Sequence, residues 1–147
     1  MFIHGFGGSG VLFYEMMAPL AEHFHAHFID IIGMGNSSRA PYQVEGAEAS
    51  LDYFMSFIES WRESRGLTNF FLAAHSLGGY LASNYYIRYA HHIKKLFLVS
   101  PIGFMKKPEN FDISRLQVVK LLDANGKKVP NKGPPGYALR KVWPYAF

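Results

Sequence analysis

Short apolar segments alternate with helical segments along the first 100 residues of this 147-residue chain. Four segments have the length and apolar character of buried strands, and three carry apolar residues at helical spacing. Parallel strands need a crossover between them, usually a helix, so this alternation predicts an α/β fold: a parallel sheet with helices on its faces. The expected strands are residues 1–4, 27–32, 69–74 and 95–100, and the expected helices are residues 11–24, 49–65 and 77–90.

The expected helix 49–65 has the clearest amphipathic pattern, with a stripe that should face the core and with Gly66 ending it. The expected helix 11–24 has a second stripe, at spacings of four residues. The first stripe is Leu51, Phe54, Met55, Ile58 and Trp61, the second is Leu12, Met16, Leu20 and Phe24, and the charged residues Asp52, Glu59, Arg62 and Glu63 should lie off the first.

Composition excludes several classes of protein. The chain has no cysteine, which excludes disulfide scaffolds, cysteine zinc sites and thiol nucleophiles. Apolar residues make up 49% and charged residues 18%, as in a globular domain rather than a disordered one. The chain has no run of basic residues of the kind that binds nucleic acid. The uncharged stretch 69–87 is too polar for a membrane span, and the first residues lack the pattern of a signal peptide.

Charge divides the chain into two parts. Residues 1–93 carry four basic and eight acidic residues, a net charge of −4, whereas residues 94–147 carry eleven basic and three acidic residues, a net charge of +8. Six of the eight prolines lie at or after Pro101. We therefore expect a folded core over residues 1–100 and a basic, proline-rich segment over residues 101–147, in which residues 112–122 form a helix.

A glycine-rich turn follows the first expected strand. Residues 5–10 read Gly-Phe-Gly-Gly-Ser-Gly, and Asp30 ends the next strand twenty residues later. This layout is typical of a dinucleotide-binding site, in which the glycines admit a pyrophosphate and the acid binds a ribose hydroxyl. A glycine-rich strand-to-helix turn without a ligand gives the same pattern, so the motif alone leaves both interpretations open.

A second turn carries a serine. Residues 72–79 read Leu-Ala-Ala-His-Ser-Leu-Gly-Gly, between an expected strand and an expected helix. This is the G-x-S-x-G pattern of a nucleophile elbow, with Ala74 in the first glycine position. Such a turn holds its serine, here Ser76, in a strained backbone conformation with the hydroxyl exposed above the sheet, and small residues on either side allow strand and helix to approach. Dinucleotide binding does not require a serine here.

If residues 72–79 form a nucleophile elbow, the glycine turn at residues 5–10 has a second interpretation. A hydrolase with this elbow stabilises the oxyanion with the N–H after the nucleophile, here Leu77, and with a second N–H from a glycine-rich loop. We expect Phe6 to provide the second N–H, with Gly7 as the next candidate. Gly5, Gly7 and Gly8 would let the backbone approach the acyl oxygen.

These motifs together resemble the α/β-hydrolase fold family over about residues 1–108. More narrowly, the chain is similar to the abhydrolase subfamily of lysophospholipases and lipase coactivators, whose coactivators carry Asn in place of the elbow serine. The resemblance implies an incomplete α/β-hydrolase sheet followed by the start of a lid. The matching motifs are residues 4–8, 30–38, 74–79 and 96–101, and those of the subfamily are residues 4–8, 35–39, 57–62 and 100–104.

The resemblance implies a serine hydrolase of lipid or carboxylic esters, with hydrolysis or acyl transfer as its reaction and Ser76 as nucleophile. The family's triad continues with an acid and then a histidine. Only His91 and His92 follow Ser76, and no acid precedes them, so we expect a fragment without its acid and base that is inactive or weakly active by itself. The alternatives are a non-catalytic lipid-binding or lipase-regulating protein and, less favoured, an NAD-binding oxidoreductase.

The expected partner is an acyl-lipid substrate, with no cofactor, no metal and no nucleic acid. A His-x-Asp metal cluster around His23, His25 and His27 is weighed and not favoured. Basic and aromatic residues interleave in the segment 94–147, which suits the headgroup layer of an anionic membrane or lipid droplet, although a solvated lid edge would look the same. The sequence thus predicts a cytoplasmic protein at the periphery of a lipid surface.

Overall fold

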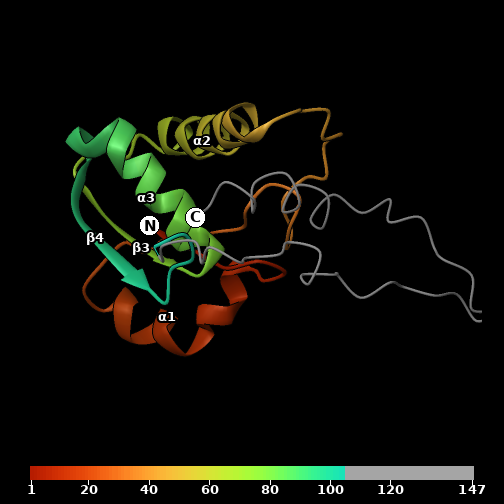
Figure 1. Ribbon diagram of the computed structural model, residues 1–147. Coiled ribbons are helices and arrows are strands. Elements are labelled where there is room, and N and C mark those ends of the chain that lie inside the picture. The colour runs from red at the N-terminus through yellow and green to blue at the C-terminus, as the bar shows by residue number, and fades with distance from the viewer. Residues whose placement is uncertain (105–147) are drawn as a thin grey trace, which may run out of the picture.

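A computed structural model describes residues 1–104 of the chain, and they form a parallel four-stranded sheet with helices on both faces (Figure 1). The strand order is β2-β1-β3-β4, and all three pairings are parallel, as the alternation predicts. The strands are β1 (Phe2–Ile3), β2 (Phe28–Ile29), β3 (Phe70–His75) and β4 (Ile93–Val99). The α/β class is therefore confirmed.

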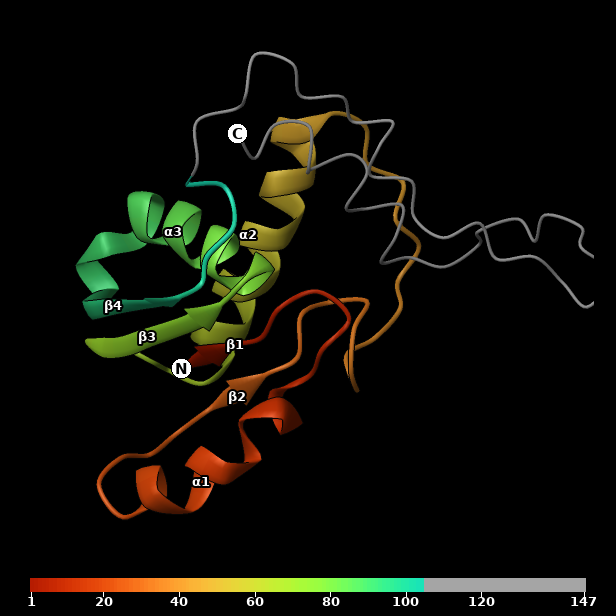
Figure 2. The same ribbon diagram turned by 60° about the horizontal axis from the view of Figure 1, so that its bottom comes forward.

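Helices α2 (Ala47–Ser64) and α3 (Leu77–Tyr89) cover one face of the sheet, and α1 (Tyr14–Ala21) lies on the other (Figure 2). Two 3₁₀ turns, η1 (Gly10–Phe13) and η2 (Ala90–His92), adjoin α1 and α3. Parallel pairing puts the carboxyl ends of all strands at one edge of the sheet, so the loops after β1, β2, β3 and β4 gather there.

The core lies between the sheet and the pair α2 and α3. The predicted stripe of α2 faces it, with Phe54, Met55 and Ile58 buried and the two end residues partly buried. Leu72 of β3 and Leu81 of α3 are fully buried in the same cluster. Gly66 ends α2 as predicted, at a positive φ of 61°, with its N–H bonded to Glu63 O.

One side-chain prediction is wrong, and the second apolar stripe is not covered by residues 1–104. Arg62 is buried rather than off the stripe of α2, because its guanidinium bonds to the Glu59 carboxylate and to Leu67 O. The stripe of the first helix is largely exposed, since nothing among residues 1–104 covers the outer side of α1: Leu12 is 66% exposed and Met16 46%. That helix is also shorter than predicted, because the segment begins as the 3₁₀ turn η1.

Strand boundaries differ from the predicted ones for local reasons. The strand predicted at 27–32 is only two residues long, because the Ile31 N–H bonds to the His4 ring and not to a neighbouring strand. Strand β4 begins two residues early and ends at Val99, where Ser100 takes a positive φ of 44°. The predicted basic segment 101–147, with its helix 112–122, lies outside the described residues except for 101–104.

No helix within residues 1–104 is long and apolar enough to cross a membrane.

Candidate active site

Ser76 stands at the turn between β3 and α3. Its backbone has φ 55° and ψ −119°, and its side chain makes no capping hydrogen bond to the helix that it precedes. A serine at the start of a helix usually has an extended backbone and accepts a hydrogen bond from a helix N–H. Ser76 does neither, so the predicted strained conformation is present and its hydroxyl is not used to cap α3.

Three backbone hydrogen bonds hold this turn in place. The Ser76 N–H donates to Val99 O at 3.1 Å, and Ser76 O accepts from Tyr80 N at 3.2 Å and from Ile102 N at 3.3 Å. A strained backbone persists only where its surroundings fix it. The end of β4 and the segment that follows it provide that constraint.

Glycines after Ser76 allow the close approaches that the motif predicts. A Cβ on Gly78 would lie 2.3 Å from His4 O and 2.6 Å from Ile3 O, so only glycine lets α3 begin this close to the end of β1. A Cβ on Gly79 would lie 2.7 Å from Pro101 Cβ, a contact that the sequence pattern did not indicate.

The glycine loop after β1 lies against the Ser76 turn, as predicted. A Cβ on Gly5 would lie 2.9 Å from Ser76 Cβ and 3.4 Å from Ser76 Oγ. Phe6 follows with a half-exposed side chain, and Gly7 has a positive φ of 68°. Leu77 is the first residue of α3, where backbone N–H groups have no partner within the helix. The structure thus brings the Gly5–Phe6 segment, Ser76 and the amino end of α3 together.

Asp30 follows β2 and binds its own loops. Its carboxylate accepts the Gly10 N–H at 2.5 Å and the Asn36 N–H at 2.7 Å. A Cβ on Gly35 would lie 2.2 Å from Asp30 Oδ2, so the loop packs directly on the carboxylate. A ribose hydroxyl would have to displace these bonds, which counts against the dinucleotide interpretation.

The histidines after Ser76 are far from it. His91 and His92 lie in η2, beyond the thirteen residues of α3, which at helical rise span about 20 Å. Within the described residues, no hydrogen bond joins the Ser76 hydroxyl to a histidine.

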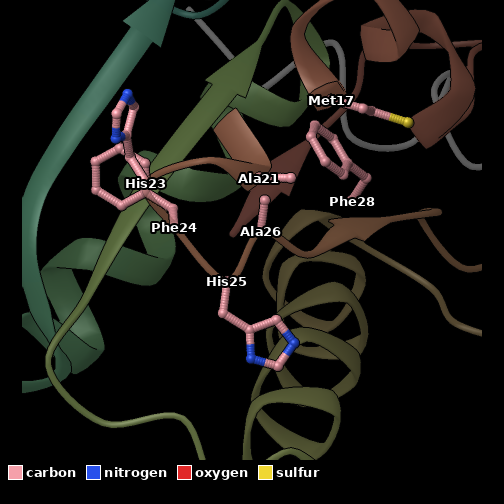
Figure 3. Close-up of a pocket in the computed structure, with 7 residues that line it drawn as sticks. All are labelled: Met17, Ala21, His23, Phe24, His25, Ala26 and Phe28. Carbon is pink, nitrogen blue, oxygen red and sulfur yellow. The ribbon is translucent and has the colours of Figure 1, made fainter. Parts of the chain in front are cut away.

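Two histidines before Ser76, His23 and His25, line a surface hollow of about 740 Å³ near α1 and β2. None of the candidate site residues lines it, and Figure 3 shows the rings of His23 and His25 pointing away from each other. No three histidine, aspartate or glutamate side chains within residues 1–104 are grouped so that they could hold a metal ion.

His4 is the functional candidate whose importance the sequence did not reveal. Its side chain is completely buried beneath the glycine loop, and both ring nitrogens have hydrogen-bond partners. In the sequence, His4 stands out only by its position directly before the glycines. We interpreted it as one residue of a His-Gly-rich loop and predicted no contact for its ring.

Comparison with known proteins identifies the family of the chain. A model of the α/β hydrolase fold family matches residues 1–137. The (lyso)-N-acylphosphatidylethanolamine lipase of Homo sapiens is 44% identical over 110 residues, which are 74% of this chain and 31% of that protein. A probable 1-acylglycerol-3-phosphate O-acyltransferase of Oryza sativa subsp. japonica is 36% identical over 108 residues, 74% of this chain and 26% of that protein. The chain therefore spans about a third or less of these relatives.

Solved structures agree on the fold. The serine hydrolase CCSP0084 from the bacterium Cycloclasticus zankles superposes with a TM-score of 0.64 at 24% identity, over 73% of this chain and 38% of that one. The predicted family, with its lipid-related relatives, is confirmed by these matches.

Proposed function

This chain belongs to the α/β-hydrolase fold family, and from that premise we propose that it carries the nucleophile and the oxyanion donors of a serine hydrolase acting on acyl-lipid esters. Ser76 is the nucleophile, and the N–H groups of Leu77 and Phe6 are the oxyanion donors.

One observation carries the proposal: Ser76 has a positive φ and an uncapped hydroxyl at a strand-to-helix turn. An incidental serine in a glycine turn would have no reason to keep a strained backbone, because glycine adopts positive φ without steric cost. The retained serine also favours an enzyme over the lipase-regulating alternative, whose family members carry Asn at this position.

The arrangement supports acyl transfer through a covalent intermediate. Ser76 Oγ attacks the ester carbonyl carbon, and the negative charge that develops on the carbonyl oxygen is stabilised by the two N–H groups. The ester C–O bond then breaks, the alcohol takes the proton that left Ser76, and the acyl group stays on Oγ. Water, or the hydroxyl of a second lipid, attacks this acyl ester and regenerates Ser76.

A general base must move the proton in both steps. His91 and His92 lie about 20 Å from Ser76 along α3, and His4 is buried with both ring nitrogens bonded. The chain spans 31% of the human lipase that it resembles, so we assign the base and its acid to the remainder of the whole protein.

The relatives support the substrate class that we propose. One matched relative is named as a lipase of a phosphatidylethanolamine lipid and the other as an acyltransferase of an acylglycerol phosphate. Both names describe acyl esters of glycerophospholipids, which we propose as the substrates here, with hydrolysis as the reaction. Contact between the basic segment 94–147 and an anionic lipid surface stays a prediction from charge.

The test uses the full-length protein, meaning the longest natural form that contains residues 1–147. A fluorophosphonate probe should label it covalently at Ser76, and Ser76→Ala should abolish labelling and reduce fatty-acid release from a lysophospholipid at least about a thousandfold. The matched control is Ser83→Ala on the same helix, whose hydroxyl only bonds back to Gly79 O, and it should label normally. Labelling that persists in Ser76→Ala would exclude Ser76 as the nucleophile.

A further inference from the structure

His4 lies completely buried under the glycine loop, with a defined arrangement of its two ring nitrogens. Nε2 lies 3.0 Å from the Ile31 N–H, and Nδ1 lies 2.6 Å from Gly5 O. A backbone N–H can only donate, so Nε2 must be the accepting nitrogen. The proton of the neutral ring is therefore on Nδ1, and it is donated to the Gly5 carbonyl.

The Gly5 carbonyl has a second donor. The Gly8 N–H also donates to Gly5 O, at 3.2 Å, which closes the loop into a turn around this oxygen. Glycine fits this turn closely, since a Cβ at position 8 would lie 3.2 Å from both Gly5 O and His4 Nδ1, closer than an ordinary contact. Two donors from the inner side of the loop therefore fix one carbonyl.

A fixed carbonyl also fixes the N–H of the next residue. The peptide bond is planar and trans, so the Gly5 carbonyl and the Phe6 N–H point in opposite directions. With Gly5 O held on His4, the Phe6 N–H must point away from the buried ring. The same segment lies beside the nucleophile, because a Cβ on Gly5 would be 3.4 Å from Ser76 Oγ.

We propose that His4 is a positioning residue: through its bond to Gly5 O, it holds the Gly5–Phe6 peptide so that the Phe6 N–H is oriented in advance as an oxyanion donor. The inference rests on the proposed function of Ser76 and Phe6. A preoriented N–H donor stabilises the negative charge of the transition state and not the bound ester. If the Phe6 N–H loses this orientation, kcat should therefore fall while KM stays nearly unchanged.

His4 also connects this loop to the next one. Ile31, whose N–H it accepts, follows Asp30, and the Asp30 carboxylate accepts the N–H groups of Gly10 and Asn36. Through His4, these hydrogen bonds connect the glycine loop to the loop after β2. A small polar side chain at position 4 could keep only one of the two bonds of the ring, and this makes them separable by substitution.

Two substitutions separate the bonds. In asparagine, the amide nitrogen is attached to Cγ, as Nδ1 is in histidine, so His4→Asn keeps a donor for Gly5 O and loses the acceptor for Ile31. In glutamine, the terminal amide is one carbon farther out, as Nε2 is, so His4→Gln keeps an acceptor for Ile31 and loses the donor for Gly5 O. Each variant loses one buried hydrogen bond, so both should be destabilised to a similar extent.

The experiment measures kcat and KM for a lysophospholipid, together with thermal unfolding, in the full-length protein. We expect His4→Gln to lower kcat about a hundredfold with KM within about threefold, and His4→Asn to keep kcat within about fivefold. The exposed His23→Gln is the matched control and should behave as wild type. Equal kcat in the two His4 variants, or a kcat loss that follows the melting temperature alone, would overturn the inference.

A measurement on the wild-type protein keeps the test decisive if the variants do not fold. Selective ¹⁵N NMR of the histidines should show His4 as the neutral ring protonated on Nδ1, and a ring protonated on Nε2 would overturn the proposed bond. Failure of the proposed function is seen separately, as wild-type protein in which the fluorophosphonate probe does not label Ser76.

Discussion

The two faces of the sheet are covered to different extents by residues 1–104. On the face of α2 and α3, a continuous apolar cluster is buried, and Leu72 and Leu81 are fully excluded from solvent. On the face of α1, the helix has no buried residue, and the side chains of Phe97 and Val99 on β4 are more than half exposed. Phe2, Phe13 and Phe28 are stacked or tilted against one another and attach the η1–α1 segment to the sheet.

This difference shows that an apolar stripe is buried only where a second element covers it. The stripe of α2 belongs to one buried cluster with residues of the sheet and of α3. The stripe of the first helix recurs every four residues, and its Phe24 ring meets the sheet edge-on at Phe71 of β3, but Leu12 and Met16 stay largely exposed. Burial of apolar surface is the main stabilising contribution to folding, so the free energy of unfolding should depend on the α2 and α3 face.

The largest expected effect compares a core leucine with a methionine on the other face. Leu81→Ala in α3 should lower the free energy of unfolding of the 147-residue chain by about 2–5 kcal/mol, because it leaves a cavity in the buried cluster. Met16→Ala in α1 should change it by less than about 0.5 kcal/mol, since Met16 is 46% exposed. Urea unfolding followed by circular dichroism measures both. Similar losses in the two variants would mean that the faces contribute equally.

A polar network joins α2 to α3 beside the apolar cluster. The Arg62 guanidinium donates two hydrogen bonds to the Glu59 carboxylate, at 2.9 and 2.7 Å, and the Tyr85 hydroxyl donates a third. The hydrogen bonds from Arg62 hold the pKa of Glu59 below its ordinary value, and burial raises the pKa of the Tyr85 hydroxyl. A second ion pair, between Arg88 of α3 and Asp52 of α2, links these two helices at the protein surface.

The second prediction compares these two ion pairs. Arg62→Met should lower the free energy of unfolding by about 3 kcal/mol, because it leaves the Glu59 charge partly buried without its main partner. Arg88→Met removes an exposed pair between α2 and α3 and should change the free energy of unfolding by less than about 1 kcal/mol. Urea unfolding at pH 7 measures both. A larger loss of stability in Arg88→Met than in Arg62→Met would mean that solvent reaches the Glu59–Arg62 pair.

The local sequence patterns predicted the arrangement of strands and helices more accurately than they predicted which side chains are buried. The alternation of segments predicted the parallel sheet, and the glycine and serine motifs predicted the turn at Ser76 and its approach to Gly5, because these depend on steric requirements of single residues. Burial of Arg62 depends on Glu59 and on Leu67 O, and exposure of Met16 depends on what covers α1. Neither can be read from periodicity.

The burial and the hydrogen bonds of His4 were not predicted, for a related reason. Its partners are its neighbour Gly5 and, across β1 and β2, Ile31, twenty-seven residues later in the chain. A histidine before glycines looks the same in sequence whether its ring is exposed or buried. The spacing of Asp30 also fits a ribose-binding acid, the less favoured alternative, whereas the fold uses its carboxylate to bind two loops.

The smallest expected effect concerns His27, directly before β2, the strand at one edge of the sheet that residues 1–104 form. Its ring meets Trp61 of α2 edge-on at 5.4 Å and lies 4.6 Å from the His25 ring. Burial lowers the pKa of His27 below its ordinary value of 6.5, and the positive charges of His25, the N-terminal amine and Arg65 lower it further. The edge of the sheet should therefore tolerate a charged His27 less well than the unfolded chain does.

The sign of the pH dependence follows from this pKa. As pH falls through about 6.5, the unfolded chain takes up a proton at His27 before the folded chain does, so the free energy of unfolding should decrease. His27→Gln should make the urea midpoint fall less between pH 7.5 and pH 5.5 than it does in wild type. An unchanged dependence in His27→Gln would mean that the ring does not titrate against the fold, and that the packing of the edge strand on α2 is too loose to exclude water from it.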